Sequence, residues 1–165
     1  MTEITFRGTP VTTVGQLPEV GSAAPAFEVT GGDLKPLTNE AFAGKKLVLN
    51  IFPSVDTGIC AMSVRRFNEI AAGLDGVAVL CVSRDLPMAL GRFCGAEGIE
   101  NVTVASDFRT NFGEAYGVTM ADGPLEHLLS RAVVVVDADG TVVYTEQVPE
   151  IGQEPDYDAA LAALS

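Results

Sequence analysis

Strand-length apolar runs, separated by segments rich in chain breakers, constrain the fold of this chain more than any other feature. Residues 47–52, 77–82 and 132–136 are almost wholly apolar, as in strands that are buried on both faces of a sheet. Apolar residues recur at helical spacing over 59–74 and 86–96, after the first and second of these runs. Strands that alternate with helices in this way predict an α/β fold with a mixed central sheet flanked by helices.

The flanking segments complete a single domain of residues 1–165. Residues 4–6 and 11–13 lie on either side of an Arg-Gly-Thr-Pro turn and predict an N-terminal β-hairpin. Glycines and prolines scattered over 21–36 predict mostly loop there. A helical turn is expected to open at 38–40 and end at Gly44, followed later by a strand at 102–105 and a short helix at 110–116. A strand at 141–148 is expected to pair with 132–136 across an Asp-Gly turn. Asp156 is expected to cap a last helix that runs to Leu164.

The charge balance excludes several classes of partner. Ten basic and 22 acidic residues give a formal net charge of −12, whereas nucleic-acid binding needs a basic surface that neutralises phosphates. Anionic membrane surfaces are disfavoured for the same reason. The chain is 47% apolar and only 19% charged, which is typical of a folded protein and not of a disordered one. No segment approaches the roughly 18 consecutive apolar residues that suggest a membrane span.

Cysteine usage indicates a reducing compartment. The three cysteines, Cys60, Cys81 and Cys94, are too few and too widely spaced for a disulfide framework, and an odd number leaves one unpaired. With one histidine, His127, a closed zinc site is not expected. The first seven residues show no basic start followed by an apolar stretch, so no secretory signal is visible. We therefore expect a cytoplasmic protein in which any disulfide is chemical and not structural.

The segment at 53–60, Pro-Ser-Val-Asp-Thr-Gly-Ile-Cys, is the most informative for function. Pro53 ends the buried strand and stiffens the loop, and Cys60 falls in the first turn of the following helix. There the free backbone N–H groups and the positive end of the helix dipole favour a thiolate, which is the nucleophilic form of cysteine. The alternative is an inert cysteine on the inner face of the helix. Thr57 is either only a helix cap or both a cap and a substrate contact.

Pro-x-x-x-Thr-x-x-Cys after a buried strand resembles the active-site signature of the peroxiredoxins. Residues 60–68, 92–98, 106–109 and 130–140 extend this resemblance to the bacterial thiol peroxidase subfamily, an atypical 2-Cys group. The similarity covers essentially the whole chain, including the N-terminal hairpin. It implies a thioredoxin-like fold in its peroxiredoxin form. Gly58 departs from the pattern, since the subfamily usually has proline there, and this puts the rigidity of the loop in doubt.

The resemblance implies a role for each site residue. Cys60 is the peroxidatic nucleophile, which attacks a hydroperoxide and becomes a sulfenic acid. Thr57, the N–H groups at the helix start and the guanidinium of Arg131 donate hydrogen bonds to the developing negative charge. Without the resemblance, Arg131 reads as a solvated residue at the entry to the strand at 132–136.

Cys94 is the resolving thiol by the same resemblance, whereas its position alone is compatible with a half-buried helix cysteine. The sulfenate on Cys60 condenses with Cys94 in the same subunit, and thioredoxin reduces the disulfide. Because the two thiols lie on different helices and a disulfide requires Cα atoms within about 7 Å, we expect one or both helix starts to unwind locally. The subfamily also implies a homodimer, a preference for alkyl hydroperoxides, and no metal, flavin or haem.

Other residues are expected to play no part in the chemistry. Cys81 lies inside a buried strand and is interpreted as core, Arg65 and Arg66 as surface charges, and His127 as a loop residue. Arg109 belongs either to the surroundings of the site or to a subunit contact. Two other function classes remain open at this level: a redox sensor or relay that passes oxidation to a partner, and a binding or holdase module with an incidental cysteine.

Overall fold

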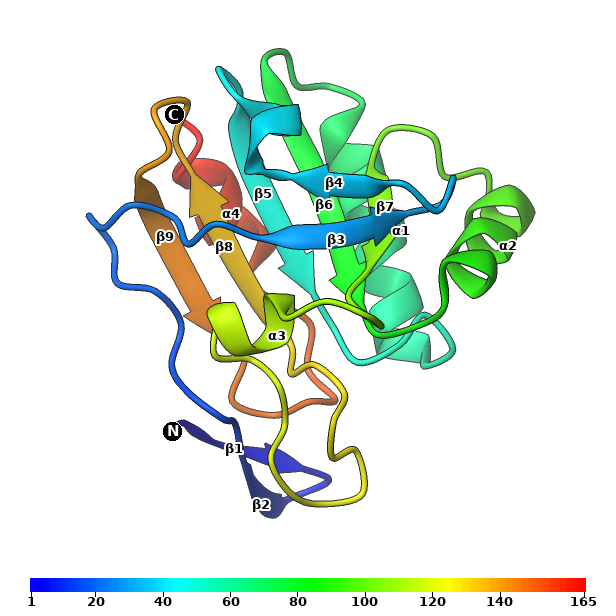
Figure 1. Ribbon diagram of the computed structural model, residues 1–165, viewed down its shortest axis with the longest axis vertical. Helices are drawn as coiled ribbons and strands as arrows, with labels where there is room; N and C mark the ends of the chain where they lie inside the picture. The colour runs from blue at the N-terminus through cyan, green and yellow to red at the C-terminus, as the bar shows by residue number, and fades with distance from the viewer.

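Pairing of the central strands determines the layout of the molecule. The computed structural model describes residues 1–165, and its main sheet has seven strands in the order β4-β3-β7-β6-β5-β8-β9 (Figure 1). At the centre, β5 (Lys46–Ile51) runs parallel to β6 (Val77–Ser83) and antiparallel to β8 (Ala132–Val136). Outside these lie β7 (Thr103–Ser106), beside β6, and β9 (Val142–Gln147), beside β8. The predicted α/β fold with a mixed sheet is confirmed.

Helices cover both faces of the sheet. Three of them pack on one face: α1 (Gly58–Ala71), α2 (Pro87–Glu97) and α4 (Tyr157–Ala162). The short η1 (Asn39–Phe42) and α3 (Phe112–Ala115) pack on the other, in front of the sheet in Figure 1. No helix is long and apolar enough to cross a membrane, since even α1 has only 14 residues.

Alternation of side chains along β5, β6 and β8 assigns each residue to one of two cores. Val48, Val79 and Val133 face α1 and pack in one core with Val64 and Phe67. The residues that follow them in each strand point the other way, into a core that is closed by three aromatic rings: Phe27, Phe112 and Tyr116. Both faces of the central strands are therefore buried, which accounts for their uninterrupted apolar sequences.

The N-terminal hairpin is confirmed and forms a separate two-stranded sheet of β1 (Glu3–Phe6) and β2 (Thr9–Thr12). It lies at one end of the molecule, away from the main sheet (Figure 1). Backbone hydrogen bonds join Thr5 to the segment after β9: its N–H donates to the carbonyl of Pro149 at 2.8 Å, and its carbonyl accepts from Ile151 N at 2.9 Å. The Glu150 carboxylate also accepts from Gly8 N at 2.9 Å.

Residues 21–36 are mostly loop, as expected, but the sequence analysis missed a strand within them. This segment contains β3 (Glu28–Gly31) and leads into β4 (Pro36–Thr38), an antiparallel pair at the edge of the sheet. Pro36 is the first residue of the edge strand, where a missing N–H disturbs the ladder least. Leu34, in the turn between the two strands, has φ +66°. The nearby glycines therefore marked a chain reversal correctly, and the reversal joins two strands. The breaker residues marked a hairpin turn and an edge strand.

The remaining elements lie where the sequence predicted them, within a few residues. The helical turn is η1, and the short helix at 110–116 is reduced to α3. The strand at 141–148 is β9, which pairs antiparallel with β8. Asp156 caps α4 as expected, since its carboxylate accepts a hydrogen bond from Ala159 N at 3.0 Å.

Candidate active site

Strand register brings Arg131 to the start of α1. Ile51, the last residue of β5, is the partner of Ala132, the first residue of β8. Arg131 therefore stands beside the point at which the chain leaves β5 and turns toward α1. Because side chains alternate, Arg131 shares the α1 face with Val133. Its side chain is among the largest that are fully buried, with 1% of the residue exposed, so the solvated position considered above is wrong.

The guanidinium of Arg131 donates hydrogen bonds both to the reactive-site sulfur and to a backbone carbonyl that holds the arginine in place. Its Nη2 donates a hydrogen bond to the Sγ of Cys60 at 3.1 Å, and its Nε donates to the carbonyl of Ile151 at 2.9 Å. Its Nη1 is buried and has no hydrogen-bond partner. Arginine stays protonated under all ordinary conditions, so a permanent positive charge faces a buried sulfur. The buried sulfur of Cys60 thus has a fixed cation as its hydrogen-bond donor.

The Ile151 carbonyl is itself held in place by the N-terminal hairpin. Ile151 donates its N–H to Thr5, and Glu150 accepts from the hydroxyl of Thr5 at 3.0 Å. The N–H groups of Gly152 and Gly8 donate to the Glu150 carboxylate and lower its pKa. An ionised carboxylate at this position therefore ties the hairpin to the loop that supports Arg131.

Cys60 is the third residue of α1 and is completely buried. The N–H groups of a helix's first turn have no partner within the helix, and the helix dipole adds partial positive charge there. The thiol therefore lies between this helix end and the guanidinium of Arg131. Gly58 is the first residue of α1, where a Cβ would meet nothing within 4 Å. The site thus has room for a side chain at the position where the resemblance leads one to expect proline.

Thr57 is the N-cap residue of α1, but its side chain does not cap the helix. Its hydroxyl donates instead to the carbonyl of Ser54 at 3.1 Å, across the turn that begins after Pro53. Pro53 is buried and Thr57 is exposed, so the loop runs from the core to the surface immediately before the reactive segment. Both interpretations of Thr57 included a capping hydrogen bond, and this bond is not made.

Cys94 has a different environment from Cys60. It lies in the last turn of α2, and its carbonyl accepts from Ile99 N at 3.0 Å where the helix ends. Its thiol is half-buried and free, and burial raises its pKa. Cys94 lies on the second helix, as predicted, in the last turn and so far from the helix start at which we expected unwinding. Both helices are intact while the two thiols are free.

Cys81 is a core residue, as predicted. It is completely buried on β6, and burial raises the pKa of its thiol to about 12. The side-chain amide of Asn50 donates to its sulfur at 3.6 Å, which lowers that pKa only in part. A thiol that keeps its proton at neutral pH is a poor nucleophile.

Three arginines and the histidine lie outside the site. Arg65 pairs with Glu97 at 2.8 Å and Arg66 with Glu69, all on the surface as predicted. Arg109 donates to the hydroxyl of Thr30 and to the carbonyl of Leu34, so it supports the β3–β4 turn. The exposed His127 lies in a loop, as predicted. No three His, Cys, Asp or Glu side chains are grouped so that they could hold a metal ion.

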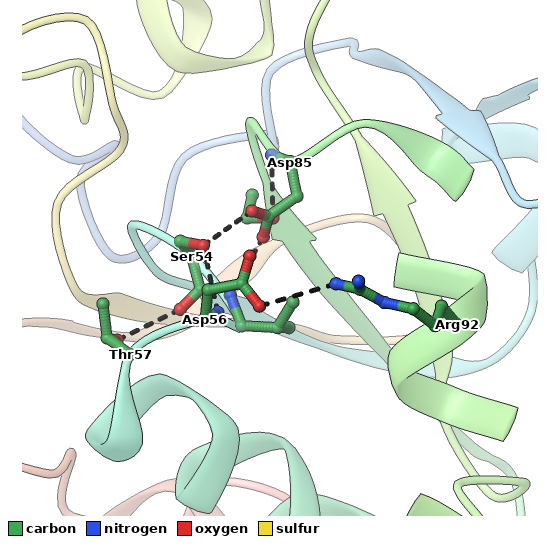
Figure 2. Close-up of polar contacts among 7 residues, drawn as sticks. Ser54, Asp56, Thr57, Asp85 and Arg92 are labelled. Atoms are coloured by element: carbon green, nitrogen blue, oxygen red, sulfur yellow. Dashed lines mark hydrogen bonds and ion pairs between the residues drawn. The ribbon is translucent and has the colours of Figure 1, made fainter. Parts of the chain in front are cut away.

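The sequence analysis missed Asp85, which holds the loop at 53–57. This carboxylate accepts hydrogen bonds from the hydroxyl of Ser54 at 2.6 Å and from Val55 N at 2.9 Å (Figure 2). Asp85 lies just after β6, and the carboxyl ends of the parallel strands β5 and β6 meet at the same edge of the sheet. The available signal was Ser83 at the end of β6, followed two residues later by Asp85.

The comparisons with known proteins agree with this geometry. Residues 19–161 match the Redoxin family. The chain belongs to this family. Thiol peroxidase from Mycobacterium tuberculosis is 64% identical over 164 residues, which span 99% of each chain. Thiol peroxidase from Corynebacterium glutamicum is 56% identical over 165 residues, which span 100% of each.

A solved structure adds evidence for the fold. The crystal structure of a peroxiredoxin-like protein from Aquifex aeolicus matches with a TM-score of 0.92 at 42% identity, over 99% of this chain and 96% of that one. The predicted thioredoxin-like fold and the resemblance to thiol peroxidases are both confirmed.

Proposed function

We propose that Cys60 is the group with which this protein reduces peroxides. Thiol peroxidases at 64% and 56% identity over the full chain identify it as a thiol-dependent peroxidase, an oxidoreductase that reduces hydrogen peroxide and organic hydroperoxides. The observation that best supports Cys60 is its buried sulfur 3.1 Å from the guanidinium of Arg131, with a second buried nitrogen of that guanidinium still unpaired.

In the first step the thiolate of Cys60 attacks the terminal oxygen of the hydroperoxide. A sulfur–oxygen bond forms and the oxygen–oxygen bond breaks, which leaves a sulfenic acid and an alkoxide or hydroxide. The leaving oxygen takes up a proton and departs as an alcohol or as water. The free Nη1 of Arg131 and the N–H groups at the start of α1 are placed to donate to that oxygen as its charge develops. Thr57 contributes its hydroxyl once the bond to Ser54 is exchanged for one to the peroxide.

In the second step the thiol of Cys94, after losing its proton, attacks the sulfenic sulfur of Cys60. A disulfide forms and the hydroxyl leaves as water. Cys60 is completely buried at the start of α1, and Cys94 is at the end of α2, so we expect the step to involve local unwinding. The reductant we propose is thioredoxin, whose dithiol restores both cysteines by exchange. No metal, flavin or haem takes part.

The cellular setting belongs to the same proposal. A dithiol-recycled enzyme needs a reducing compartment, and three free cysteines favour the bacterial cytoplasm. We propose that residues 1–165 work as one domain and that the protein is a homodimer, as the resemblance to thiol peroxidases implies.

Cysteine variants test the two steps separately. Cys60→Ser is expected to abolish peroxide-dependent NADPH oxidation in the presence of thioredoxin and thioredoxin reductase, because a serine hydroxyl is not ionised near neutral pH. Cys94→Ser is expected to consume one equivalent of peroxide without a reductant, and then to turn over roughly tenfold more slowly. Cys81→Ala is the matched control and should keep its turnover.

Intact mass and peptide mapping after one equivalent of peroxide complete the test. The proposal requires a loss of two hydrogens and a peptide that joins Cys60 to Cys94. Peroxide turnover that survives in Cys60→Ser would contradict it and favour a binding module with an incidental cysteine. Oxidation of Cys60 without thioredoxin-coupled turnover would favour a sensor or relay instead.

A further inference from the structure

We propose that Asp85 is a positioning residue that holds the start of α1 in its reactive conformation and joins it to the start of α2. The inference rests on the proposed function of Cys60 and Cys94. It concerns how the protein keeps the peroxide-reactive conformation and the disulfide-forming conformation apart.

Both oxygens of the Asp85 carboxylate are used. Oδ1 accepts from the hydroxyl of Ser54 at 2.6 Å, while Oδ2 accepts from Val55 N at 2.9 Å and from the hydroxyl of Ser83 at 2.6 Å (Figure 2). Ser83 and Val55 are buried and Asp85 is half-buried. Hydrogen bonds to a charged acceptor at partly buried positions are stronger than those between neutral groups. Three donors therefore converge on one carboxylate that has no part in the peroxide chemistry.

The bonds of Asp85 continue to Cys60 through the loop. Ser54, which Asp85 holds, accepts from both the N–H and the hydroxyl of Thr57 through its carbonyl. Thr57 is the N-cap of α1, and its own carbonyl accepts the helix bond from Ala61 N at 3.0 Å. The position of the first turn of α1, and with it the sulfur of Cys60, is thus set by the carboxylate of Asp85.

Asp85 also marks the entrance to the other thiol helix. It precedes α2 by two residues, and α2 begins at Pro87 and carries Cys94 in its last turn. The loops that lead into α1 and α2 therefore meet at one side chain. Unwinding of α1 that extends into the loop at 53–57 would break the bonds to Ser54 and Val55. The carboxylate accordingly stabilises the folded arrangement, in which Cys60 faces Arg131, against the unwound arrangement that the disulfide requires.

This role predicts opposite effects on the two half-reactions. In Asp85→Asn an amide replaces one oxygen, so Ser54 and Val55 can no longer both donate to the side chain along with Ser83. The second-order rate with hydrogen peroxide should fall about tenfold, because a charged acceptor has been lost from the loop. The rate at which the Cys60 sulfenate becomes the disulfide should stay the same or rise, because the unwound arrangement is easier to reach.

The experiment uses the full-length reduced protein, rapid quenching with an alkylating reagent and intact mass. The sulfenate is counted as one added oxygen and the disulfide as a loss of two hydrogens. Asp56→Asn is the matched control: its side chain lies in the same loop but pairs only with the exposed Arg92, at 3.7 Å, so both rates should remain those of the parent protein. Ser54→Ala removes one bond from the carboxylate and should show the same pattern as Asp85→Asn, more weakly.

Two outcomes would overturn the inference. One is a peroxide rate in Asp85→Asn and Ser54→Ala within about twofold of the parent, which is the size expected of a loop contact with no positioning role. The other is a parallel fall of both rates, which a general loss of structure produces. In either case the parent protein, measured beside the variants, still reports on Cys60 and Cys94, so the inference can fail while the proposed function stands.

Discussion

The two helices that carry the proposed redox thiols place them at opposite ends. Cys60 is in the first turn of α1, and Cys94 is in the last turn of α2. The helix dipole favours an anion at the first position and disfavours one at the second. Arg131 reinforces the difference at Cys60, and burial raises the pKa of Cys94. The same amino acid thus has a buried cation as its donor in one helix and an environment that raises its pKa in the other.

The two helices also differ in how firmly they are attached to the sheet. α1 buries five residues, among them Val64 and Phe67, whereas α2 buries only Pro87 and Leu90. α2 also contains Gly91 and Gly95, each of which costs roughly 1 kcal/mol of helix stability relative to alanine. α2 therefore unwinds at a lower free-energy cost than α1. Unwinding it removes both effects that keep Cys94 protonated.

The largest effect is expected where the difference between the thiols is greatest, at Arg131. Arg131→Lys keeps one positive charge but cannot reach the sulfur of Cys60, the carbonyl of Ile151 and the peroxide at the same time. The second-order rate with peroxide should fall by about 100-fold, the usual cost of a lost donor to developing charge. Arg65→Lys, on the surface of α1, is the control. A fall of only a few-fold in Arg131→Lys would mean that the helix end alone activates Cys60.

A smaller effect is expected when α2 is made harder to unwind. At Gly91 and Gly95 an added Cβ would meet nothing within 4 Å, so both can be changed to alanine without strain. The double variant should form the Cys60–Cys94 disulfide roughly tenfold more slowly, because the folded helix is stabilised by up to about 2 kcal/mol. Its reaction with peroxide should be unchanged. Gly32→Ala, in the β3–β4 turn, is the matched control.

A disulfide rate unchanged by these two alanines would contradict this expectation. The unwinding would then belong to α1 alone. Hydrogen exchange at the amides of α2 would separate this case from a failure to stabilise the helix.

The smallest effect is a pH dependence at Cys94. Burial raises the pKa of this thiol in the folded protein, so the folded state binds its proton more tightly than the unfolded state does. The contribution of Cys94 to the free energy of unfolding is therefore fully present below the ordinary cysteine pKa. It is lost as the pH rises through the raised pKa of the folded state. In a Cys60→Ser, Cys81→Ala background, alkylation of Cys94 near pH 8 should be a few-fold slower than in urea. Equal rates would place Cys94 in a solvent-like environment.

The reactive segment was predictable because its signal is local. Pro53, Thr57 and Cys60 lie within eight residues, and a buried strand followed by a helix fixes the position of Cys60 in the first turn. The amphipathic and apolar runs that define α1, β5, β6 and β8 also depend on neighbours in sequence. These parts of the fold follow from the pattern alone.

The partners of Cys60 were not predictable from local pattern. Arg131 is 71 residues away, and only the pairing of Ile51 with Ala132 brings it to the sulfur; the sequence suggested it through resemblance. Asp85 was missed because its role depends on the parallel pairing of β5 and β6. The β3–β4 pair was missed because a three-residue edge strand that begins with proline reads as loop.

The N-terminal hairpin is connected to the site through the bonds of Thr5 to residues 149–151. The family match begins at residue 19, so the hairpin is an addition to the shared redoxin body. Yet it braces the Ile151 carbonyl that orients Arg131, some distance from any reacting atom. A proteolytic cut in the first dozen residues, or a bulky fusion that detaches them, would accordingly lower the reactivity of the Cys60 sulfur before it lowered the stability of the fold.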